Sequence, residues 1–134
     1  MLDPISDMLT RIRNAARAGH PEVSIPLSKL KLKIIQILAE KKFIESFSEE
    51  PGGKHKWIKV VLRYIKDDSG RVVSYIQGIE RVSREGRRIY VRKNKISKTK
   101  GGYGFSVIST SRGVMADDTA RKAGLGGEII CRIW

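Results

Sequence analysis

The sequence predicts an α+β protein: a small N-terminal α/β lobe, then a β-rich C-terminal lobe with one short helix. Two stretches within residues 3–40 show helical apolar spacing, whereas most later segments alternate apolar and polar residues. Turn-forming glycines and aspartates separate those later segments. A chain of 134 residues can form two small lobes. We expect the lobes to span residues 1–68 and 69–134, with the seam in residues 65–71.

The N-terminal lobe should contain two helices. Asp3 can cap the first, because Pro4 suits the first helical position. Apolar residues then recur at helical spacing, namely Ile5, Met8, Leu9, Ile12, Ala15 and Ala16. Gly19 ends this helix, and Ser28 can cap the second. The expected core face of the second helix consists of Leu30, Ile34, Ile37 and Leu38.

The other elements of this lobe are expected to be strands. One covers residues 23–27, and Pro26 within it favours an edge strand, since proline cannot donate to a neighbouring strand. A turn at residues 51–53 and a hairpin connection at residues 67–70 mark two breaks. Three more strands are expected, at residues 43–48, 58–64 and 72 to about 82.

The C-terminal lobe continues the alternating pattern. Glu85 and Gly86 form a turn. Asp117 can cap a short helix over residues 119–123, which Gly124 ends. Strands are expected at residues 88–92, 105–109 and 128–134.

The positive charge of the chain is concentrated. The net charge is +13 and the pI is near 10.2. Residues 81–100 hold nine basic side chains and a single acidic one, Glu85. Such a band indicates a polyanionic partner such as RNA. An ordinary solvated surface is the alternative, but it would mix both signs of charge, as residues 40–59 do.

Several classes of function lack support in the sequence. His20 and His55 lie far apart without clustered carboxylates or thiols, so we expect no metal site. No nucleotide-binding fingerprint or catalytic arrangement is present, so we expect neither a cofactor nor an enzyme. No apolar run approaches the roughly 18 residues of a membrane span, and no secretory signal is visible. The single cysteine, Cys131, cannot form an internal disulfide, which favours the cytoplasm.

An exposed tyrosine is expected in the basic band. Alternation sends Ile89 and Val91 to the core face of their strand and Arg88, Tyr90 and Arg92 to the other face. A ring between two guanidinium groups suits RNA, because bases stack on the ring and phosphates bind the cations. The alternative is a tyrosine that packs against a neighbouring strand.

Short hydroxyl residues follow the next strand. Ser109, Thr110 and Ser111 precede Arg112 and Gly113, between a predicted strand and a predicted helix. Such hydroxyls donate and accept hydrogen bonds and can enter a shallow RNA minor groove. On residue chemistry alone, an ordinary turn in which they bond their own backbone is the stronger interpretation.

Two further groups of polar residues are candidate RNA contacts. Gly126 and Gly127 allow another backbone, or RNA, to approach closely. The Glu128 carboxylate can accept bonds from RNA or position a loop, although it could equally pair with Arg132 on the same strand. On the first helix, a polar stripe offers a secondary RNA contact and consists of Thr10, Arg13, Asn14 and Arg17.

Three segments resemble one family. "ISDMLTRIRNA" at residues 5–15 and "STSRGVMADDTARKAGLGGEIICRIW" at residues 109–134 look like the opening and closing signatures of bacterial small-subunit ribosomal protein eight. "RVSREGRRIYV" at residues 81–91 is similar to the family's central segment. The resemblance covers essentially the whole chain in order.

The resemblance implies a non-catalytic, two-lobed protein of the cytoplasmic ribosome that binds the central domain of small-subunit ribosomal RNA, early in assembly and beside other ribosomal proteins. A regulator of its own operon's messenger RNA is the alternative. It implies that Ser109, Thr110 and Ser111 enter the RNA minor groove and that Glu128 helps to form this site. The predicted RNA-binding set is Ser109, Thr110, Ser111, Glu128, Tyr90, Arg88, Arg92, Lys93, Lys95, Arg112, Gly126 and Gly127.

The chain also departs from the family pattern. Ala116 stands where a hydroxyl residue is frequent, which removes a possible extra cap before Asp117. Residues 97–103 are unusually rich in lysine and glycine, so family contacts are not transferred to them.

Overall fold

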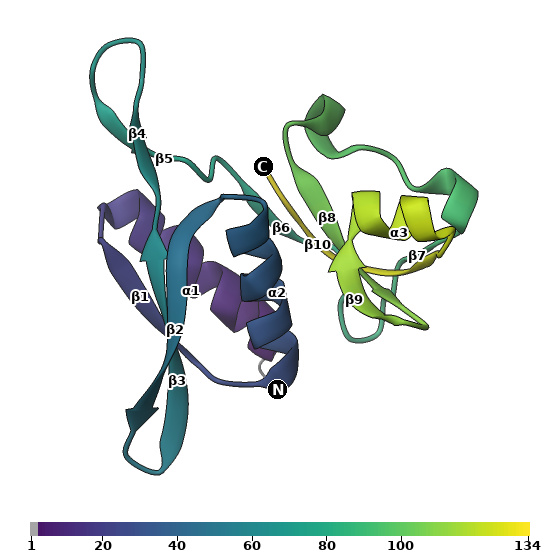
Figure 1. The fold of residues 1–134 in the computed structure, drawn as a ribbon, viewed down its shortest axis with the longest axis horizontal. Coiled ribbons are helices and arrows are strands. Elements are labelled where there is room, and N and C mark those ends of the chain that lie inside the picture. The colour runs from purple at the N-terminus through teal and green to yellow at the C-terminus, as the bar shows by residue number, and fades with distance from the viewer. Residues whose placement is uncertain (1–2) are drawn as a thin grey trace. The chain divides into compact units, whose positions relative to one another are not determined.

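The computed structural model describes residues 3–134, and the chain divides into two compact units (Figure 1). One unit is Asp7–Gln77, and the other is Gly78–Trp134 together with the first residues of the chain up to Ser6. The predicted α+β class is confirmed. The lobe boundary placed at residues 68/69 lies nine residues before this division and stays a prediction.

The first unit packs two helices on a three-stranded antiparallel sheet. The helices are α1 (Pro4–Ala18) and α2 (Lys29–Glu40). The strands, in sheet order, are β1 (Glu22–Pro26), β3 (His55–Leu62) and β2 (Ile44–Gly52). The predicted edge position of the Pro26 strand is confirmed, since β1 pairs only with β3. Fully buried apolar side chains fill this core, among them Met8, Leu9, Ile12, Ile25, Ile34, Ile35, Leu38, Ile58 and Val60.

Both predicted N-terminal caps are confirmed. The backbone N–H of Ile5 donates to Asp3 Oδ1 at 3.0 Å, and the N–H of Lys31 donates to Ser28 Oγ at 3.2 Å. The predicted core face of α2 is wrong at Leu30, which is 37% exposed. Lys31 takes that place, because its apolar stem is buried while its ammonium group reaches the carbonyl of Pro26.

The strand predicted from residue 72 to about 82 is wrong. The chain instead forms β5 (Val72–Ser74), which pairs with β4 (Tyr64–Lys66) in a separate hairpin, and then β6 (Ile79–Arg81) in another sheet. Gly78 causes the change of partner, since it exchanges two backbone hydrogen bonds with Trp134. A side chain at this position would meet the Trp134 indole at 2.2 Å.

The second unit is built on a five-stranded antiparallel sheet. Its order is β6–β10–β8–β9, and β7 pairs with the start of β10. The strands besides β6 are β7 (Tyr90–Val91), β8 (Phe105–Thr110), β9 (Gly113–Ala116) and β10 (Gly127–Ile133). Two short 3₁₀ turns, η1 (Lys93–Lys95) and η2 (Thr99–Gly102), interrupt the connection from β7 to β8. Strand β9 was not predicted, so the hydroxyl residues lie in a β-hairpin and not between a strand and a helix.

The helix α3 (Asp117–Ala123) covers one face of this sheet near the β8–β9 hairpin (Figure 1). The predicted cap is wrong: Ala116 occupies the N-cap position without a side-chain bond, and Asp117 is the first helical residue. The Asp117 carboxylate is buried and accepts from Arg121 one turn later, at 3.3 Å. The predicted end at Gly124 is confirmed by its left-handed backbone.

Candidate nucleic-acid interface

Three of the predicted site residues lie in one row across three strands. In the antiparallel pairing, Glu128 of β10 stands opposite Tyr90 of β7 on one side and opposite Ser109 of β8 on the other. Directly paired residues point to the same face of a sheet. Each of these three segments is almost twenty residues from the next in the sequence, and the sheet brings them together in one surface.

The opposite face of the same strands is buried. Ile108, Ile129 and Ala120 of α3 form an apolar cluster, and Ile89 and Val91 pack against it. The alternation predicted around Tyr90 is thus confirmed, because its neighbours are partly buried while its ring is 70% exposed. Helix α3 closes one face, and the row of polar side chains remains on the other.

The three hydroxyl residues differ in their hydrogen bonding. Thr110 Oγ1 donates to the carbonyl of Gly113 at 2.8 Å and accepts from the N–H of Arg112 at 3.1 Å, so it stabilises the β8–β9 turn. Within residues 3–134, the hydroxyls of Ser109 and Ser111 make no hydrogen bond. The ordinary-turn interpretation therefore holds for Thr110, and the two serines keep their hydrogen-bonding capacity.

Gly126 and Gly127 let β10 enter between its neighbours. A Cβ atom at Gly127 would lie 2.1 Å from the carbonyl oxygen of Ser109. One at Gly126 would lie 2.4 Å from the carbonyl oxygen of Val91 and 2.8 Å from the N–H of Lys93. The close approach in the structure is that of the protein's own backbone, and an RNA contact at these glycines stays a prediction.

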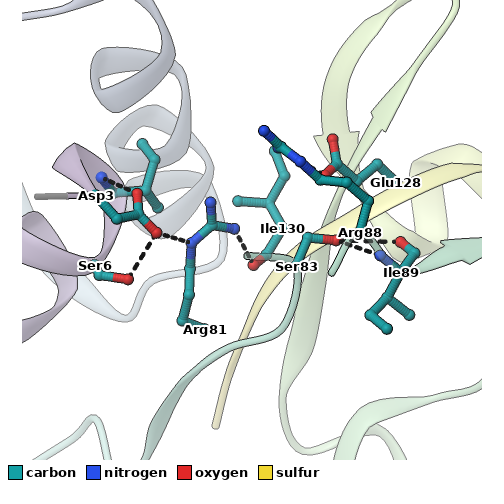
Figure 2. Close-up of polar contacts among 9 residues, drawn as sticks. Asp3, Ser6, Arg81, Ser83, Arg88, Ile89, Glu128 and Ile130 are labelled. Atoms are coloured by element: carbon teal, nitrogen blue, oxygen red, sulfur yellow. Dashed lines mark hydrogen bonds and ion pairs between the residues drawn. The ribbon is translucent and has the colours of Figure 1, made fainter. Parts of the chain in front are cut away.

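Glu128 pairs with a different arginine from the one considered in the sequence. Arg88 Nη1 donates to Glu128 Oε2 at 3.0 Å, and Figure 2 shows the two side chains facing each other. Arg132 pairs with Glu80 instead, at 3.1 Å, because Glu80 stands directly opposite it on β6. The hydrogen bond and charge of Glu128 raise the pKa of Arg88. This pair links β10 to the turn before β7 at the edge of the row.

That turn is closed by Ser83 and by its own backbone. Arg84 and Arg87 exchange two backbone hydrogen bonds, while buried Ser83 both donates to and accepts from the backbone of Ile89 (Figure 2). Arg84 and Arg87 are consequently exposed at the tip, beside Arg88. These two arginines were not included in the predicted site, although the run of arginines around Glu85 and Gly86 could have indicated them.

One arginine of the basic band is unavailable to a partner. Arg81 Nε donates to Asp3 Oδ2 at 2.9 Å, and its Nη1 donates to the carbonyl of Ile130 at 2.7 Å (Figure 2). Burial alone would raise the pKa of Asp3, but hydrogen bonds from Arg81, Ser6 and the Ile5 backbone, with the Arg81 charge, lower it to about 2. Asp3 stays ionised, and Arg81 serves to hold β6 beside the bulge in β10.

Other predicted cations are exposed. No ion pair in the described part of the chain involves Arg92, Lys93, Lys95 or Arg112. Lys93 begins η1, whose backbone lies beside Gly126, just before β10. Arg112 lies in the β8–β9 turn, next to Ser111. Unpaired cations thus border the row on both of its sides.

The predicted secondary contact belongs to the other unit. Thr10, Arg13, Asn14 and Arg17 lie along α1, and all but half-buried Arg13 are exposed. They form a stripe on a helix and are not part of the row on β7, β10 and β8. Their binding of RNA stays a prediction.

Features of other functional classes are not found. Among residues 3–134, no group of three or more His, Cys, Asp and Glu side chains could hold a metal ion. In the same residues, no helix is long and apolar enough to cross a membrane. Burial raises the pKa of the Cys131 thiol to about 12, so it is a core side chain and not a nucleophile.

The fold and this surface define a class: a small, basic α+β protein with a polar sheet face bordered by cations. A family model described as "Ribosomal protein S8" matches residues 3–134. The chain is 45% identical to small ribosomal subunit protein uS8 of Finegoldia magna over 134 residues, which cover 100% of this chain and 99% of that protein. It is 48% identical to the uS8 of Solibacter usitatus over 132 residues, 98% of each chain.

The chain belongs to the ribosomal protein S8 family. The predicted family is therefore confirmed, and so is the prediction of a non-enzymatic ribosomal protein of translation.

Proposed function

We propose that this protein is a constituent of the small ribosomal subunit that binds the central domain of its ribosomal RNA directly and helps the subunit to assemble. The relatives named above are small-subunit proteins. The observation that carries the proposal is the row of Tyr90, Glu128 and Ser109 on a sheet face whose reverse is closed by α3.

Each part of the row has a distinct task. The serine hydroxyls, which have no partner among the described residues, are free to contact ribose hydroxyls and base edges in a shallow minor groove. The exposed ring of Tyr90 offers a surface for stacking. The bordering cations, such as Lys93 and Arg112, bind phosphates and add attraction that hardly depends on RNA sequence.

Glu128 positions its surroundings as well as offering an acceptor. Its ion pair with Arg88 fixes one guanidinium group beside Tyr90. Because Glu128 is paired directly with Ser109, the strand register determines where Ser109 and Ser111 lie on the same face of the sheet. The stripe of α1 adds a secondary contact with RNA, and neighbouring small-subunit proteins complete the environment.

The test removes the two free hydroxyls without changing charge. Ser109→Ala together with Ser111→Ala should weaken binding to a central-domain RNA fragment about tenfold, which corresponds to about 1.4 kcal/mol, because the RNA then loses hydrogen bonds. Affinity for an unrelated hairpin of equal length should change less than twofold. Filter binding or fluorescence anisotropy at one fixed salt concentration measures both.

Ser46→Ala with Ser48→Ala is the matched control, since both serines lie on β2 in the other unit. The proposal that these serines recognise the RNA would be wrong if the serine variant lost equal affinity for both RNAs. It would also be wrong if the control variant lost as much affinity as the serine variant. Footprinting on intact ribosomal RNA and co-sedimentation with small subunits then test the location. A regulator that acts only on messenger RNA would fail to co-sediment.

A further inference from the structure

Only one other tyrosine is as exposed as Tyr90. Among residues 3–134, the exposed large aromatic side chains are Tyr90, at 70%, and Tyr103, at 88%. Tyr64 donates its hydroxyl to the backbone of His20, and Tyr75 packs on Phe43. Tyr103 has no such partner in the described structure, and nothing proposed above uses it.

The backbone around Tyr103 is anchored, so its exposure is not that of a loose loop. Thr99 is buried, and the N–H of Gly104 donates to its carbonyl. Gly104 is packed so closely on the end of β10 that a Cβ there would lie 2.3 Å from the carbonyl oxygen of Ile133. The Lys100 ammonium lies 4.6 Å from the ring centroid of Trp134. The fold therefore holds the Tyr103 ring out in solvent.

The segment of the chain that holds Tyr103 is rich in positive charge. Residues 86–116 contain eight lysines and arginines and no aspartate or glutamate. Lys98 and Lys100 are exposed, and no ion pair within the described residues involves them. Both exposed tyrosines lie in this acid-free segment. An aromatic ring beside unpaired cations is the combination that binds nucleic-acid strands by stacking and phosphate contact.

This second cluster lies at the far end of the sheet from the first. The η1 turn adjoins Gly126, just before β10, whereas the η2 turn adjoins Trp134, just after it (Figure 1). Strand β10, whose seven residues lie between Gly126 and Trp134, separates the two turns by about 25 Å in extended conformation. One short RNA element cannot contact both ends, but an RNA that continues along the sheet can.

We propose that residues 98–104 form a second RNA contact, in which Tyr103 stacks on a base or on the end of a helix while Lys98 and Lys100 bind phosphates. It rests on the proposed function, because the RNA that reaches it is a continuation of the RNA bound at Ser109 and Glu128. An acidic protein is the competing occupant. RNA is favoured because the acid-free segment runs without interruption from the first surface to the second.

The experiment uses the full chain with two RNAs. The short RNA is the smallest central-domain fragment that the unchanged protein still binds more tightly than an unrelated hairpin, and the long RNA is the intact central domain. Tyr103→Ala should weaken binding to the long RNA about tenfold and leave the short RNA within twofold. Tyr103→Phe keeps the ring and should bind both RNAs like the unchanged protein.

Lys98→Gln with Lys100→Gln tests the phosphate contacts. On the long RNA, the slope of log affinity against log salt should become shallower by about 1.5 to 2. Lys54→Gln with Lys56→Gln is the charge-matched control at the exposed β2–β3 hairpin of the other unit, and should change the slope by less than half as much. The thermal midpoint of Tyr103→Ala should match that of the unchanged protein, because the ring is almost fully exposed.

Three results would overturn the second contact: wild-type affinity of Tyr103→Ala for the long RNA, an equal loss on the short RNA, or equal slopes for the two lysine pairs. Loss of binding to an acidic ribosomal protein, with RNA affinity unchanged, would assign the surface to that partner instead. The serine pair separates the two proposals. If Ser109→Ala with Ser111→Ala changes the affinity for neither RNA, the proposed function is wrong. If this double variant binds both RNAs more weakly while Tyr103→Ala binds them like the unchanged protein, only the second contact is wrong.

Discussion

The central strand of each large sheet carries one charged residue in a comparable position, and the two are surrounded differently. On β3, Lys59 stands opposite Ser24 and Ser48, and its ammonium group pairs with Glu50 at 3.2 Å and Glu22 at 3.9 Å. Acidic residues from both neighbouring strands thus satisfy one lysine. The charge of Lys59 is therefore balanced within its own sheet.

On β10, Glu128 also stands between two strands, but the balance of charge is reversed. It is a single carboxylate among cations, paired with Arg88, and its direct neighbours are a free serine and an exposed tyrosine. The two units carry similar net charges, +6 for residues 7–77 and +7 for residues 78–134 together with residues 1–6. Net charge therefore does not distinguish a binding surface here, whereas the placement of the acids does.

The largest expected effect is that of a substitution at Gly127, where the backbones of β10 and β8 lie close together and form the row. Gly127→Ala should lower the free energy of unfolding by about 3 kcal/mol, because the new methyl group would collide with the carbonyl of Ser109. RNA binding should fall with it. Urea denaturation, followed by circular dichroism, measures the loss.

Gly70→Ala in the β4–β5 hairpin is the control for that variant. Gly70 has a φ of 81°, but a Cβ there meets no atom within 4 Å. Only backbone strain remains, so the cost should be about 1 kcal/mol. Equal costs for the two variants would mean that β10 can shift away from β8, and that the row is less rigid than its register indicates.

The second effect separates the partnered tyrosines from the exposed ones. Tyr75 packs edge-on against Phe43 at 5.1 Å between ring centroids, and the Arg63 guanidinium lies 3.9 Å above its ring. Tyr75→Ala should cost about 2 kcal/mol of stability and leave RNA affinity unchanged. Tyr90→Ala should leave stability within about 0.5 kcal/mol and weaken RNA binding by about 1–3 kcal/mol.

Thermal melting measures the stability of each variant, and RNA titration measures its affinity. A collapse of stability in Tyr90→Ala would show that the ring contributes to the core in solution. A loss of RNA affinity in folded Tyr75→Ala would show that the partnered ring also lies on the RNA surface, and the contrast between the units would disappear.

Local patterns in the sequence predicted much of this molecule. The caps at Asp3 and Ser28 and the exposure of Tyr90 depend on residues within four positions, and the structure confirms them. Helical spacing and strand alternation are properties of the same short range. The α+β class follows from these patterns because it needs only the kind and order of the elements.

Two of the errors concern choices between distant partners. Apolar and polar residues alternate over residues 72–82 as they would in one continuous strand. In the structure, Gly78 instead forms backbone hydrogen bonds with Trp134, more than fifty positions away. The sequence offered Arg132 as the ion-pair partner of Glu128. In the structure, the register of β6 places Glu80 opposite Arg132, and Glu128 pairs with Arg88 instead. Alternation fixes which face a side chain is on; it does not fix which strand lies beside it.

The smallest expected effect tests Glu128 directly. In Glu128→Gln, two consequences oppose each other: loss of a negative charge favours any polyanion, whereas loss of the Arg88 partner and of a strong acceptor harms the site. We expect the second to dominate for cognate RNA, with about fivefold weaker binding, or about 1 kcal/mol. An unrelated hairpin should bind as before or slightly more tightly. Affinities at one fixed salt concentration are sufficient.

Glu80→Gln is the matched control for Glu128→Gln, because it removes the same charge and breaks the equivalent ion pair, with Arg132, on the same sheet. It lies away from the row, so it should tighten binding of both RNAs slightly through charge alone. If Glu128→Gln behaves like Glu80→Gln and tightens the cognate complex, Glu128 is only a surface charge that neutralises Arg88. The contrast with Lys59 would then be one of sign and not of function, and the proposed site would be reduced to the serines, Tyr90 and the bordering cations.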